Sequence, residues 1–205
     1  MKKFSKVLMV AMGFLLAFGV CFGMSACGGE SEEKVVQGQI DADLDKFKSL
    51  DEDEIKELIG DDQVFVDAGI DPVDFYKALF GKFDYVDNGV EIDGDAGKVK
   101  LTVTALDLDK AMDTFGGHLR DYMNSDQAID DFTNKGEKGL MNAMFTMMIE
   151  DFNATDTKTA DVVLPIVKND DGEWDLDMTD DEVGSALFAG ADLDKVFDLD
   201  ALMEE

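Results

Sequence analysis

The chain has 205 residues, of which 47 are acidic and 18 are Lys or Arg, so its formal net charge is −29. This charge argues against nucleic-acid partners, because affinity for phosphates depends on a surplus of Lys and Arg. It does not indicate a disordered chain, since the hydrophobic content of 45%, with 15 Phe and 12 Met, is sufficient for a core. The length suits one domain with an appendage.

An export signal is predicted at the N-terminus. Lys2, Lys3 and Lys6 precede an apolar run that begins at Val7 and ends near Gly23. A basic segment followed by an apolar segment is typical of a secretory signal peptide. The run is also near the lower length limit of a membrane-spanning helix, so an uncleaved membrane anchor stays open as an alternative.

The residues that follow, Met24-Ser25-Ala26-Cys27, resemble the lipobox of bacterial lipoproteins. In a lipobox, a small residue precedes the Cys that is lipidated and becomes the mature N-terminus. Met24 departs from the usual Leu, and Cys21 is a weaker match because Val20 precedes it. The resemblance implies a signal peptide over residues 1–26, an acyl anchor of the palmitate kind on Cys27, and a location on the extracytoplasmic face of the cell membrane. The alternative is an ordinary thiol at Cys27 after another kind of signal peptide.

Residues 27–39 are predicted to form a flexible tether, because Gly and Glu dominate their first half. The domain that follows contains no cysteine, so an oxidising compartment adds no disulfide to it. Removal of the signal peptide with its three lysines changes the net charge from −29 to −32.

Helical spacing of apolar residues predicts the first elements of the domain. One helix is expected over residues 40–47, and Ser49 with Glu52 forms a capping-box pattern for a second helix that stops at Gly60. Asp71-Pro72 is typical of a further helix start.

The pattern then changes to period two. Residues 98–105 alternate between apolar and polar side chains, which predicts a half-buried strand. Residues 83–93 contain Asp87-Asn88-Gly89 and predict either a hairpin or a bulged strand. Near the end of the chain, residues 162–167 are expected to pair with residues 174–178 in a closing hairpin.

Helices are predicted over residues 108–122 and 137–152, and a last helix, capped by Thr179 and Glu182, over residues 179–190. An acidic tail is expected over residues 191–205. This order predicts one α+β domain over residues 40–190, with a curved antiparallel sheet packed against helices.

A second resemblance rests on two short motifs. The stretch from Tyr85 to Asp107 and the closing segment from Lys168 to Asp177 resemble small lipoprotein domains of unknown function with a nuclear-transport-factor-2-like, or cystatin-like, fold. The resemblance implies a curved sheet with a pocket and no particular reaction, because the wider fold hosts enzymes, binding modules and scaffolds. Inward strand positions are the pocket candidates and are apolar, so they bind an apolar ligand or simply form core: Val99, Leu101, Val103, Trp174 and Leu176.

His118 is the only histidine of the chain, and Asp121 lies one helical turn after it. Such a pair is an acid–base candidate. The alternative is a residue at the edge of an apolar stripe with an acidic neighbour, which is common among 47 acidic groups. The sequence therefore predicts no enzyme, and a weak enzyme that uses His118 is the lesser alternative.

Two groups of acidic residues are candidates for metal binding. Asp41, Asp43, Asp45 and Glu52 mimic the spacing of an EF-hand, but Lys46 occupies the position where the loop requires Gly. The remaining weak candidates are better explained as turn residues: Asp87, Asp93, Asp95, Asp170 and Asp171. No cofactor is predicted, and a calcium-responsive surface domain stays open as an alternative.

Residues 140–152 form an apolar helix that is rich in Met. Clustered Met thioethers suit a Cu(I) site or an adaptable partner surface, but interleaved Leu, Phe and Ile favour a buried central helix. Taken together, the sequence predicts a lipid-anchored, non-enzymatic extracytoplasmic domain that acts through binding. Its expected partners are the membrane, through the lipid, and an envelope protein or an apolar ligand.

Overall fold

The computed structural model describes residues 31–49, 51–59, 63–169, 172–177 and 182–196. Several predictions fall outside this part: the signal peptide, Cys27, the helix stop at Gly60, the hairpin residues 170, 171 and 178, the cap at Thr179 and the last nine residues. Within it, no helix is both long enough and apolar enough to span a bilayer.

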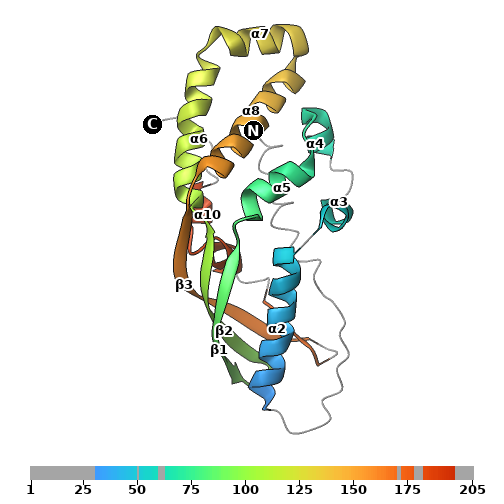
Figure 1. The fold of residues 1–205 in the computed structure, drawn as a ribbon, viewed down its shortest axis with the longest axis vertical. Helices are drawn as coiled ribbons and strands as arrows, with labels where there is room; N and C mark the ends of the chain where they lie inside the picture. The colour runs from blue at the N-terminus through green and yellow to red at the C-terminus, as the bar shows by residue number, and fades with distance from the viewer. Residues whose placement is uncertain (1–30, 50, 60–62, 170–171, 178–181, 197–205) are drawn as a thin grey trace.

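The structure combines helices with one sheet (Figure 1). The helices are α2 (Glu32–Ser49), α3 (Glu52–Ile59), α4 (Gln63–Ala68), α5 (Pro72–Phe80), α6 (Leu108–Met123), α7 (Asp126–Lys135), α8 (Glu137–Ala154), α9 (Glu182–Leu187) and α10 (Leu193–Val196). The strands are β1 (Asp84–Asp93), β2 (Ala96–Leu106), β3 (Thr157–Lys168) and β4 (Trp174–Leu176).

The four strands form an antiparallel sheet with the order β1-β2-β3-β4. Gly94 and Asp95 make the turn between β1 and β2, and Gly94 adopts a φ of 67°, which favours glycine. Helices α6, α7 and α8 are inserted between β2 and β3, and β4 pairs with the last residues of β3. The predicted α+β class with an antiparallel sheet is therefore confirmed.

One face of the sheet carries the core. Along β2 the predicted period of two is confirmed, because Val99, Leu101 and Val103 are buried while Lys98 and Lys100 are exposed. Helix α2 contacts β1 and β4, and the four buried residues of this helix are Val36, Ile40, Leu44 and Phe47. At its start, Lys168 of β3 lies 3.2 Å from Glu32.

Strand β1 contains a bulge. It lies in the segment for which the sequence predicted either a hairpin or a bulged strand. Its register with β2 shifts between Asp87 and Val90. The Asp87 carboxylate accepts a hydrogen bond from the Gly89 amide at 2.6 Å, and Gly89 adopts a φ of 111°. The bulged strand is thus the correct alternative, and such a bulge bends and twists the sheet.

The predicted boundaries of the folded domain, residues 40 and 190, differ from those of the structure. Residues 32–39, predicted as part of a tether, form the first half of α2, and Val36 is fully buried against the core. At the other end, Ala191 and Val196 are buried, so the domain extends beyond the predicted boundary at residue 190. Apolar burial explains both corrections.

The capping box of α3 lies two residues after the predicted one. The Asp51 carboxylate accepts hydrogen bonds from the amides of Asp53 and Glu54, and the Glu54 carboxylate accepts one from the Asp51 amide. The Ser49 hydroxyl instead donates to the Lys46 carbonyl at the end of α2. By contrast, the predicted start of α5 is confirmed, since Asp71 accepts from the Val73 amide at 2.9 Å.

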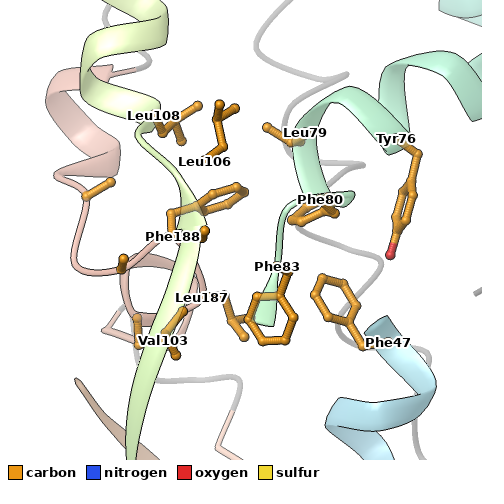
Figure 2. Packing of buried hydrophobic residues seen from close by; sticks show 14 of the residues in the cluster. Phe47, Tyr76, Leu79, Phe80, Phe83, Val103, Leu106, Leu108, Leu187 and Phe188 are labelled. Carbon is orange, nitrogen blue, oxygen red and sulfur yellow. The ribbon is translucent and has the colours of Figure 1, made fainter. Parts of the chain in front are cut away.

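Aromatic rings from α2, from α5 and from the segments that follow α5 and α9 pack together in the core (Figure 2). Phe47 of α2 lies 5.1 Å from both Phe80 and Phe83, measured between ring centroids, and Phe80 lies 5.2 Å from Phe188.

Helix α8 is the central helix predicted from its apolar sequence, because it contacts α4, α5, α6 and α7. In Figure 1, α7 lies at the end of the molecule opposite the first turn of α2.

Candidate functional site

The carboxylate that contacts His118 belongs to Asp151 of α8 and not to the predicted partner, Asp121. The Nδ1 atom of His118 lies 2.9 Å from Oδ1 and 3.1 Å from Oδ2 of Asp151. Asp151 is buried, whereas the His118 side chain is 58% exposed. An Asp that holds Nδ1 orients an imidazole as acid–base dyads require, but the contact also serves as a polar link between α6 and α8.

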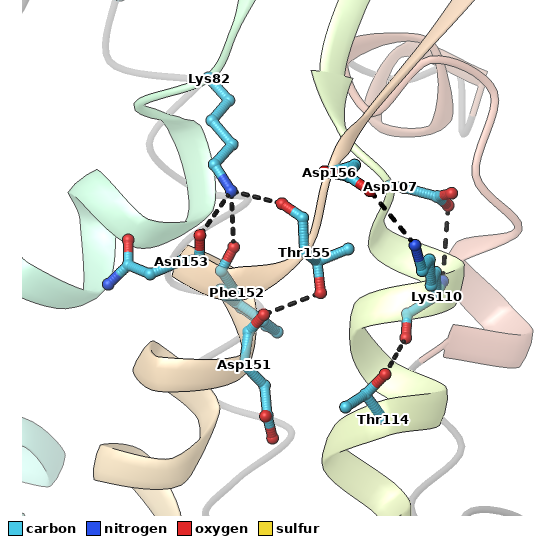
Figure 3. A network of polar contacts seen from close by, with 9 residues as sticks. All are labelled: Lys82, Asp107, Lys110, Thr114, Asp151, Phe152, Asn153, Thr155 and Asp156. Carbon is cyan, nitrogen blue, oxygen red and sulfur yellow. Dashed lines mark hydrogen bonds and ion pairs between the residues drawn. The ribbon is translucent and has the colours of Figure 1, made fainter.

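The end of α8 beside this pair is organised by Lys82, which precedes β1 (Figure 3). The Lys82 ammonium donates to the carbonyl oxygens of Phe152, Asn153 and Thr155. These carbonyls belong to the last turn of the helix and to the residue that follows it, where no helical amide is available. A cation is also favoured at the negative end of a helix dipole. Lys82 therefore has a structural role, and no local sequence signal indicates it.

The predicted pocket residues lie in the hydrophobic core. Val99, Leu101, Val103 and Trp174 are buried, and Leu176 is half-buried against the same cluster. Helices α5 and α9 pack against β2, and α2 packs against β4, so these residues have the core surroundings of the alternative raised from the sequence. Their role as ligand contacts stays a prediction.

The predicted metal candidates that the structure describes lie on α2, on α3, along β1 and in the turn after β1. Residues 41–45 lie within α2, where Tyr85 donates hydrogen bonds to the Asp41 carbonyl and to the Asp45 carboxylate. Asp93 is the last residue of β1, and Asp95 lies in the exposed turn that follows it. Among the described residues, no group of three or more His, Cys, Asp or Glu side chains is placed to hold a metal ion.

Helix α7 presents the most unusual surface of the described structure, and the sequence did not predict this helix. Its side chains are distributed in an inverted way: Asp131 is 7% exposed, whereas Ile129 is 65% and Phe132 is 56% exposed. A buried carboxylate is uncommon on a folded domain, and exposed large apolar side chains are informative where they neighbour one another. Met123, at the end of the preceding helix, is 42% exposed. We call Ile129 and Phe132, with Met123, the α7 patch.

The buried carboxylate of Asp131 fixes α7 to its neighbours. It accepts hydrogen bonds from Tyr122 of α6 at 3.1 Å, from Gln127 at 3.1 Å and from Lys135 at 2.8 Å. The hydrogen bond from Lys135, followed by that from Gln127, lowers the pKa of Asp131 from its ordinary value, so the group stays charged. The α7 patch is therefore carried by an anchored helix.

Comparison with known proteins gives one family match. The family described as a domain of unknown function (DUF5105) matches residues 73–188. No curated protein matches the chain. Among solved structures, the chain is similar to a putative lipoprotein (ycdA) from Bacillus subtilis, with 18% identity and a TM-score of 0.41. That similarity covers 90% of this chain and 54% of the other, so this chain spans about half the length of the Bacillus subtilis protein.

Proposed function

The chain belongs to the DUF5105 family, which specifies no activity, and from this premise we propose that the protein is a lipid-anchored, extracytoplasmic domain that binds another protein and catalyses no reaction. The observation that carries the proposal is the α7 patch, which exposes Ile129 and Phe132 on an anchored helix. Ile129 and Phe132 are three positions apart on one helix and are therefore neighbours on its surface, and exposed apolar side chains that neighbour one another support an interaction site.

The lipid anchor rests on the lipobox at Cys27. Four residues separate Cys27 from Glu32, the first residue of α2, and the five steps between these two residues span at most about 18 Å when fully extended. The anchored end of the domain is therefore the end at which α2 begins. Since α7 lies at the opposite end in Figure 1, the helix that carries the patch lies at the end of the domain far from the membrane.

A cystatin-like sheet is part of the same proposal. The bulge in β1 and the packing of α2 on one face support a curved sheet, as the sequence motifs imply. In this arrangement the sheet and α2 form the supporting body, and the inserted helices α6 to α8 carry the interaction surface.

Metabolic labelling with a palmitate analogue tests the anchor. We expect the wild-type chain to be labelled and the Cys27→Ala variant to be unlabelled. Equal labelling of both chains contradicts lipidation at Cys27, and it leaves the interaction part of the proposal untouched.

Photo-cross-linking in living cells tests the interaction. A photoreactive residue replaces Thr133, which is exposed on α7 one turn after Ile129, and a second chain carries it at Thr104 on the exposed face of the sheet. We expect a discrete adduct from position 133 that disappears when Ile129→Ser and Phe132→Ser are added, and no such adduct from position 104. Adducts of equal yield from both positions contradict a specific surface at α7.

A further inference from the structure

The chemistry of the partner follows from the charges around the α7 patch. Asp126 lies one helical turn before Ile129, and Asp130 follows it directly; both carboxylates are exposed. The nearby Lys135 is engaged by Asp131 at 2.8 Å. The apolar side chains are thus bordered by negative charge on a chain whose net charge is −29.

This charge distribution discriminates between the classes of occupant. A second copy of the chain places carboxylates against carboxylates, and a membrane rich in anionic lipids repels the same groups. A segment with apolar side chains and with Lys or Arg beside them complements both features of the surface. Complementary charge also speeds association and suppresses wrong partners.

The structure also holds the patch in place before a partner arrives. The Ser125 hydroxyl caps α7 by accepting from the Ala128 amide, and Gly139 lets α8 approach closely. A Cβ atom at Gly139 would lie 2.6 Å from the Lys135 Cβ atom and 2.8 Å from the Asp131 carbonyl oxygen. Because the helix is already ordered, little conformational entropy is lost when a partner binds.

We propose that the α7 patch is the docking surface for a positively charged amphipathic segment of another protein, whose apolar side chains pack on Ile129 and Phe132 and whose Lys or Arg side chains face Asp126 and Asp130. This inference rests on the proposed interaction function and adds the chemistry of the partner. Three apolar side chains form a small contact, so the complex is weak and transient, with a dissociation constant on the order of 10–100 μM.

The test uses the protein as isolated from the expressing cell, held in discs of neutral phosphatidylcholine, with the photoreactive residue at position 133. The probe is a synthetic helix of about 18 residues with Leu on one face and Lys on the other. A second peptide replaces each Lys with Glu. The measured quantity is the peptide concentration that gives half of the maximal adduct.

We expect Ile129→Ser with Phe132→Ser to raise this concentration at least tenfold without changing the charge of the protein. The matched control, Val86→Ser with Val163→Ser, removes two exposed apolar side chains from the sheet and is expected to change it less than twofold. The Leu/Glu peptide is expected to give no saturable adduct. Equal effects of the two double variants, or equal adducts from the two peptides, overturn the proposal.

The outcome also separates this inference from the proposed function. One outcome is that the two double variants have equal effects on the peptide adduct, or that the two peptides give equal adducts, while the cellular adduct still depends on Ile129 and Phe132. In that case the assigned partner chemistry is wrong and the interaction function stands. If the cellular adduct is also insensitive to these two residues, both are wrong.

Discussion

Strand β2 and helix α7 distribute their side chains in opposite ways. Strand β2 directs Val99, Leu101 and Val103 to the core and its lysines to solvent, whereas α7 buries Asp131 and exposes Ile129 and Phe132. The first arrangement maximises the apolar area removed from water, so stability explains it. The second leaves apolar area in water, so stability does not explain it, and a departure of this kind is expected at functional surfaces.

The sharpest test of this contrast compares one residue type in both places. Phe152 of α8 is fully buried, whereas Phe132 of α7 is 56% exposed. We expect Phe152→Ala to lower the free energy of unfolding by about 3–5 kcal/mol, because it leaves a cavity. Phe132→Ala is expected to change it by less than about 0.5 kcal/mol. Urea unfolding measures both, and a loss above about 2 kcal/mol for Phe132→Ala would place that ring in the core instead.

The junction between the helical insertion and the sheet depends on Lys82. We expect Lys82→Met to lower the free energy of unfolding by about 2 kcal/mol, since three carbonyls at the end of α8 lose a charged donor. Lys77→Met is the matched control, because Lys77 forms an exposed pair with Glu52 at 2.6 Å. Urea unfolding measures both variants. Equal losses of unfolding free energy would mean that the contacts of Lys82 stabilise the fold no more than an exposed ion pair does.

Local patterns predicted the elements whose apolar residues face inward. The alternation along β2 and the helical spacing of α6 and α8 led to elements that the structure confirms. Helix α7 was missed because its inward positions are Ala128 and Asp131 while its large apolar residues face solvent, so the spacing of large apolar residues indicates no buried helix face there. The prediction failed because it assumes that the large apolar residues of a helix face the core, and those of α7 do not.

Contacts between distant segments were beyond the reach of local spacing. His118 contacts Asp151, which is 33 residues away, although Asp121 satisfies the helical spacing equally well. The two capping patterns that begin at Ser49 and at Asp51 are likewise equivalent in sequence, and only the hydrogen bonds of Asp51 distinguish them. The pairing of these groups is determined by tertiary packing.

The turn between α7 and α8 tests whether the position of α7 is imposed by the backbone. Gly136 adopts φ 65° and ψ −156°, a region that is almost exclusive to glycine. We expect Gly136→Ala to lower the free energy of unfolding by about 1–2 kcal/mol. Gly117→Ala is the control of opposite sign: a Cβ atom there meets nothing within 4 Å, so a gain of about 0.5–1 kcal/mol is expected within α6. Thermal and urea unfolding measure both variants, and a neutral Gly136→Ala contradicts the backbone requirement.

The smallest expected effect concerns α2, where the supporting body itself carries a polar defect. Burial, followed by the nearby Asp175 and Glu173, raises the pKa of Asp43 from 3.8 to about 6, although Lys46 opposes the shift. The folded state therefore binds this proton more tightly than the unfolded state, and stability falls as the pH rises from about 4 to 6. Since Asp43 is partly exposed, we expect Asp43→Asn to raise the free energy of unfolding by only about 0.5–1 kcal/mol above pH 6 and to have no effect below pH 4. Urea unfolding as a function of pH measures the difference, with Asp113→Asn on the exposed side of α6 as the control. A pH-independent difference would mean that the effect of Asp43→Asn does not come from the charge of Asp43.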